Sequence, residues 1–116
     1  MDALTWAREI LLLLHLVGFG ALFGGAVVQL RDREPLVNDA MLHGSLIQLV
    51  TGLALVGVDL YADVELDLLT LGVKLVLTLL VTLLVVANRR FDSIPKGLWA
   101  LITGLVLANL AVSVLG

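Results

Sequence analysis

Cysteine is absent from this chain, proline occurs only twice, and charged residues make up 15% of its 116 positions. Without cysteine the chain has neither a disulfide framework nor a thiolate metal site. Two methionines are the only other soft ligands, so we do not expect a self-contained copper site. The formal net charge of -3 does not suggest the basic surface typical of proteins that bind nucleic acid.

Hydrophobic residues, in contrast, make up 60% of the chain, and its mean hydropathy is +1.11. A soluble domain of this size has too small a core to hide so much apolar surface, so we expect a lipid bilayer around it. A helix needs about 20 apolar residues to cross ~30 Å of hydrocarbon. Four segments have about that length: residues 10–29, 40–59, 67–88 and 97–116. The chain is therefore predicted to be one all-α, polytopic membrane domain over residues 1–116.

Short connections between these spans make successive helices antiparallel, which predicts an up-down-up-down four-helix bundle. The lysines and arginines outside the spans are unevenly distributed between the two sides. The first and third connections hold Arg31, Arg33, Arg89, Arg90 and Lys96, and the other side holds Arg8. The positive-inside rule then places these two connections in the cytoplasm and both termini outside, in the inner (plasma) membrane. The second connection, residues 59–67, is acidic and is predicted to face outward.

Two segments of the chain resemble each other. Leu49–Leu55 reads LVTGLAL in the second span, and Leu101–Leu107 reads LITGLVL in the fourth. This similarity is consistent with a bundle made of two similar helical hairpins. It is equally consistent with chance, because segments rich in leucine and valine resemble one another easily.

Small residues recur at a spacing of four, which places them on one face of a helix. In lipid, where no hydrophobic force drives helices together, such faces allow close backbone contact. The predicted packing positions are Gly20, Gly24, Gly25, Gly44, Gly52, Ala100, Gly104 and Ala108. They suit packing within the bundle or between protomers, so we expect a homo-oligomer or a larger membrane complex.

Polar residues within the spans are expected to form a cluster in the extracytoplasmic half. His15, Lys74 and Asn109 each lie roughly seven residues from the outer boundary, about 10 Å at helical rise. Asp59 and Thr51 are expected beside them, with Asp59 neutralising Lys74. An intramembrane lysine costs at least about 2.5 kcal/mol on insertion scales, so it is expected to face protein or water. Gln29, His43, Gln48 and Asn88 are assigned to a second layer nearer the cytoplasm.

The two histidines, His15 and His43, are the candidate haem or metal ligands. By helical rise they lie about 12 Å apart along the membrane normal. A single haem held by both is therefore not expected within one chain. One axial histidine, or a site shared across a dimer, stays open, as does the alternative of a neutral imidazole hydrogen-bonded inside the bundle.

Several short motifs follow one another along the chain: His15 before Gly24-Gly25, Thr51-Gly52, Leu71-Gly72 before Lys74, and Asn88-Arg89-Arg90 before Pro95. Together they resemble the four-helix domain of the copper-resistance D family, and the resemblance covers most of the chain. More distantly, the pair His15 and Lys74 is similar to the His and Lys of the bacterial membrane-type protoporphyrinogen oxidases. The tryptophan expected before the glycines is replaced by Leu22 or Phe23. The resemblance implies a four-helix membrane fold and haem b as a possible cofactor.

Three functional hypotheses follow, and none of them assigns a catalytic residue. The first is a non-enzymatic accessory, assembly or interaction subunit that packs on itself or on a larger membrane complex. The second is a haem-linked redox protein or oxidase that uses His15 and Lys74. The third is a small transporter or channel with the polar cluster as its path.

The charge distribution yields a topological prediction. A reporter placed at Arg89 or Lys96 should be cytoplasmic, because positively charged connections are retained on that side. Reporter activity and labelling of intact cells measure this directly. Labelling of the third connection from outside the cell would contradict the predicted orientation.

Overall fold

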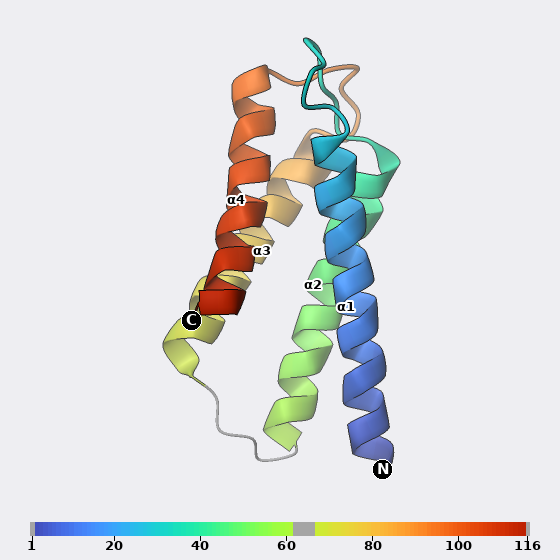
Figure 1. Ribbon diagram of the computed structural model, residues 1–116, viewed down its shortest axis with the longest axis vertical. Helices are drawn as coiled ribbons and strands as arrows, with labels where there is room; N and C mark the ends of the chain where they lie inside the picture. Colours follow the sequence, from blue (N-terminus) through green and yellow to red (C-terminus); the bar gives the residue numbers. More distant parts are fainter. Residues whose placement is uncertain (1, 62–66, 116) are drawn as a thin grey trace.

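The computed structural model describes residues 2–61 and 67–115, and this part of the chain is helical without a strand. Residues 62–66 of the acidic second connection and Gly116 of the fourth predicted span lie outside it. The helices are α1 (Ala3–Val27), α2 (Asp39–Tyr61), α3 (Leu68–Ala87) and α4 (Lys96–Leu115), and they run up and down in turn (Figure 1). Each is long and apolar enough to cross a membrane. The predicted all-α, four-helix membrane fold is confirmed.

Helix boundaries agree with the predicted spans to within two residues except at the start of α1. This helix begins at Ala3 instead of about residue 10, because Asp2 caps it and its carboxylate accepts a hydrogen bond from the Thr5 amide at 2.8 Å. Asp67 caps α3 in the same way. The hydroxyl and amide of Thr70 donate to the Asp67 carboxylate and hold its pKa below the usual range, so the cap is charged at neutral pH.

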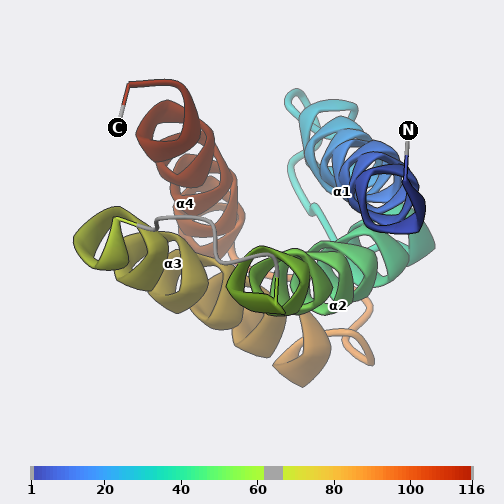
Figure 2. The ribbon, with the colours of Figure 1, turned by 90° about the horizontal axis from the view of Figure 1, so that it is seen from below.

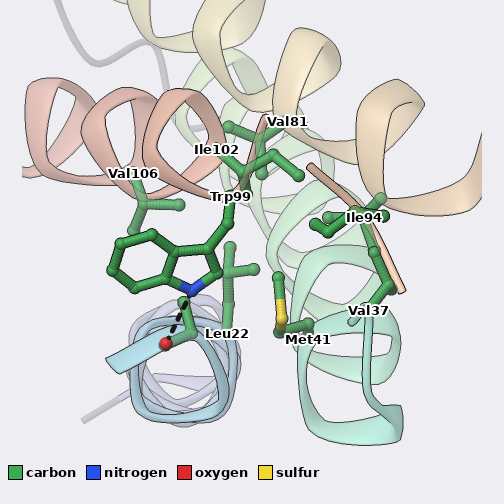
Figure 3. Packing of buried hydrophobic residues seen from close by; sticks show 10 residues of the cluster. Leu22, Val37, Met41, Val81, Ile94, Trp99, Ile102 and Val106 are labelled. Atoms are coloured by element: carbon green, nitrogen blue, oxygen red, sulfur yellow. Dashed lines mark hydrogen bonds between the residues drawn. The ribbon is translucent and has the colours of Figure 1, made fainter. Parts of the chain in front are cut away.

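The buried core lies at the end of the bundle that carries the first and third connections. Leu22, Met41, Trp99 and Ile102 meet there from α1, α2 and α4 (Figure 3). The Trp99 indole Nε1 donates to the Ala26 carbonyl at 2.9 Å, which joins α4 to the end of α1. This end of the bundle is consequently closed.

The connection between α1 and α2 is ordered by two amide side chains. The Gln29 Nε2 donates to the carbonyls of Gly25 and Leu36, and its Oε1 accepts from the Leu36 amide at 2.7 Å. Asn38 donates to the Gly25 carbonyl and accepts from the Met41 amide, both at 2.9 Å. These backbone groups lie in the connection or in the terminal turns of α1 and α2, where no helical partner is available.

Glycine brings α1 and α2 into backbone contact. A Cβ built on Gly44 would lie 2.5 Å from the Leu22 nitrogen and 2.7 Å from the Gly18 carbonyl oxygen, so only glycine fits. Gly18 was not among the predicted packing positions, because it is spaced by seven residues from Gly25 and not by four.

The predicted packing positions divide into two groups. Gly25, Gly44 and Gly52 meet neighbouring helices or loops. A Cβ on Gly20, Gly24 or Gly104 would meet nothing within 4 Å in the described part of the chain. Ala100 and Ala108 are exposed as well.

Helices α1 and α4 separate towards the end of the bundle where both termini lie. Seen along the bundle, α2 and α3 form its closed side, and a gap opens between α1 and α4 (Figure 2). The α1 and α2 helices share the most extensive contact, whereas α1 and α4 share the smallest among the pairs of helices that touch. The bundle is therefore tight at one end and open at the other.

The glycine contact predicts unequal effects of one substitution at two sites. Gly44→Ala should destabilise the protein by about 1–3 kcal/mol, because the added methyl group forces two backbones apart. Gly104→Ala is the matched control and should be neutral or slightly stabilising, since alanine is the better helix former. Thermal unfolding in detergent micelles measures both. Equal stability of the two variants would contradict the proposed contact.

Candidate functional site

A cleft of about 400 Å³ occupies the open half of the bundle. Leucines supply much of its wall, among them Leu12, Leu16, Leu55, Leu71 and Leu110. Its polar lining comes from all four helices: Arg8, His15, Gln48, Asp59, Lys74, Thr78, Asn109 and Ser113. Mostly apolar walls with a few convergent polar groups are typical of small-molecule sites.

His15 is held in one orientation at the cleft. Its Nδ1 lies 2.8 Å from the Thr51 hydroxyl oxygen, and that hydroxyl donates to the Ile47 carbonyl at 2.6 Å. Because the single hydroxyl proton is used there, the Thr51 oxygen accepts from His15 Nδ1–H, which leaves the lone pair of the neutral ring on Nε2. Gly52 lies against the ring, and a Cβ there would make an ordinary van der Waals contact with His15 Cε1 at 3.4 Å.

Asp59 does not neutralise Lys74, contrary to the expectation from the sequence. Its carboxylate pairs with Arg8 Nε at 2.8 Å, and its side chain is 13% exposed. Because α1 begins at Ala3, Arg8 is helical and stands opposite the last turns of α2. Among the described residues, no carboxylate lies within 4.0 Å of the Lys74 ammonium.

Two buried oxygen atoms have no hydrogen-bond donor in the described part of the chain. They are Gln48 Oε1 and Asn109 Oδ1. The Asn109 amide nitrogen donates to the Thr78 hydroxyl at 2.8 Å, which fixes its orientation. Both residues also line a second cavity of about 10 Å³, roughly the space that one water molecule needs.

The structure brings most of the predicted polar cluster together. His15, Lys74, Asn109 and Asp59 line the cleft, and Thr51 reaches it through its bond to His15. Arg8 and Gln48 also line the cleft, although the sequence placed neither of them in this cluster.

Gln48, which the sequence assigns to a layer nearer the cytoplasm, lines both the cleft and the smaller cavity beside it. Its spacing of three residues from Thr51 and eleven from Asp59 puts all three on one face of α2. That spacing is the sequence signal for a side chain that faces the cleft.

The two histidines are not brought together. His43 is exposed near the start of α2 and does not line the cleft. Within residues 2–61 and 67–115, no group of three or more His, Asp or Glu side chains is placed to hold a metal ion. A haem in the cleft would therefore have His15 as its one histidine ligand from this chain.

A scan against protein-family models, a search of curated proteins and a search of solved structures each found no match. The resemblance to the copper-resistance D family accordingly stays a prediction from short motifs.

The contact between His15 and Thr51 can be tested by removing one hydroxyl. Thr51→Val should lower the free energy of unfolding by about 1–3 kcal/mol, because the half-buried imidazole N–H loses its acceptor. The control is Thr103→Val, whose hydroxyl bonds only to the Trp99 carbonyl of its own helix, and its effect should be small. Thermal unfolding of both variants, alone and combined with His15→Leu, gives the coupling energy. A coupling energy of zero would show that the two side chains do not interact.

Proposed function

We propose that this protein is a non-enzymatic accessory, assembly or interaction subunit of the inner (plasma) membrane, with both termini outside the cytoplasm. The observation that carries the proposal is an exposed face on α4, formed by Ala100, Gly104 and Ala108. A Cβ on Gly104 would meet nothing within 4 Å in the described part of the chain. A neighbouring transmembrane helix can therefore approach the backbone of α4 closely.

The inside of the bundle shows what such a face does in this protein. Gly18 and Gly44 bring α1 and α2 into backbone contact, and this pair shares the most extensive interface. The face on α4 likewise carries only small residues, and Gly20 and Gly24 form a second face of this kind on α1. Van der Waals packing at small residues is a main source of helix association in lipid. Both faces suit a homo-oligomer or a larger membrane complex.

A haem-linked redox function is the second candidate, because His15 lines the cleft with the lone pair of its Nε2 free of the Thr51 bond. His15 would hold the iron, and haem would supply one-electron redox chemistry. An absorption spectrum with metal analysis, on protein made with a haem supply, decides this candidate. A transport path has less support, since the other end of the bundle is closed by a buried apolar core that includes Leu22, Trp99 and Ile102.

Lateral association can be tested because the chain has no cysteine of its own. We expect a benzophenone probe on Leu107→Cys, an exposed position of α4 beside Gly104, to give a covalent product of defined mass when it is activated in membranes. Leu83→Cys on the exposed side of α3 is the control and should give none. Gly104→Leu should also reduce the size of the complex extracted in mild detergent, because its side chain blocks close approach. Equal labelling at both positions, or a monomer without partners, would contradict the proposal.

A further inference from the structure

We propose that the cleft binds an anionic phospholipid whose headgroup carries hydroxyl groups, as phosphatidylglycerol does. The phosphate would lie at Lys74, and the hydroxyl groups would donate to the free oxygens of Gln48 and Asn109. This inference goes beyond lateral association, because it concerns the inside of the open half of the bundle and not the outer face of α4.

Charge is the first argument for a phosphate. Lys74 lines a cleft with largely apolar walls, and no described carboxylate lies within 4.0 Å of its ammonium. The carboxylate of Asp59 is taken by Arg8. An intramembrane lysine normally pairs with an opposite charge or an acceptor. A phosphate oxygen accepts a strong, charge-assisted hydrogen bond from an ammonium group.

The unpaired oxygens are the second and independent argument. The Gln48 side chain is 7% exposed, lines the cleft, and has an Oε1 without a donor in the described part of the chain. Asn109 Oδ1 is likewise buried and lacks a donor in the described part of the chain. Buried acceptors of this kind need a donor. The simplest donor is a single water molecule in the adjacent 10 Å³ cavity. The alternative donor is a headgroup hydroxyl in the larger cleft.

Access and shape favour a lipid over a soluble anion. The cleft of about 400 Å³ lies where α1 and α4 share the least contact, so acyl chains can leave sideways into the bilayer. Lys74 follows the Asp67 cap by seven residues, about 10 Å of helical rise, and a lysine side chain can extend towards the interface. A zwitterionic headgroup would place its own ammonium near Lys74, and phosphatidic acid lacks the headgroup hydroxyls.

The test is native mass spectrometry of the full chain in mild detergent, titrated with phosphatidylglycerol, phosphatidylethanolamine, phosphatidic acid or inorganic phosphate. We expect one phosphatidylglycerol per protomer, bound more tightly than the other three. Lys74→Gln should weaken this binding by roughly tenfold or more, because a charge-assisted hydrogen bond is lost. Arg90→Gln, which removes an exposed charge from the opposite end of the bundle, should leave it unchanged.

Further variants separate the headgroup contacts from folding. Gln48→Leu should reduce the preference for phosphatidylglycerol over phosphatidic acid, whereas no change would assign the Gln48 oxygen to water and overturn its role. Leu110→Trp, which fills the cleft, should abolish specific binding even if Lys74→Gln does not fold. Undiminished binding to Leu110→Trp, or an equal loss in Arg90→Gln, would overturn the site. Crosslinking from Leu107→Cys reports lateral association separately.

Discussion

The close contact between α1 and α2 is the constraint on which the rest of this structure depends. At Gly18 and Gly44 the two backbones approach so closely that a single methyl group has no space. Side-chain amides of Gln29 and Asn38 then hold the connection that follows α1. In a bilayer such contacts decide which helices pair, because apolar side chains are equally well solvated by lipid. α1 is consequently held against α2.

The cleft follows from this unequal packing. Trp99 joins α4 to the end of α1 on one side of the membrane, but the two helices separate towards the other side. Polar side chains from all four helices face the space between them. Some satisfy each other, as His15 does with Thr51 and Arg8 does with Asp59. Gln48 and Asn109 each have an oxygen without a donor in the described part of the chain, and these groups make the open half a candidate site rather than a packing defect.

Much of the polar cluster was predictable, because an ionisable or amide side chain in a span must avoid lipid and therefore faces inward. His15, Lys74 and Asn109 follow that rule. The ion pair between Arg8 and Asp59 was not predictable. It depends on how far α1 extends towards the N-terminus beyond its apolar segment, and on the helical turn that carries Arg8. Among the small residues, spacing identified faces suited to packing. It did not say that Gly44 faces a helix and Gly104 faces outward, because both have the same pattern along the chain.

The sequence by itself determined that this is a four-helix membrane protein, because apolar runs of bilayer length and short connections permit little else. It also determined which residues are too polar to face lipid. Only the tertiary structure decided that Asp59 pairs with Arg8, that Gln48 belongs to the cleft, and that α4 keeps an uncovered face. The physical reason is that helix length and polarity are local properties, whereas tilt and partner choice are set by contacts between residues far apart in the chain.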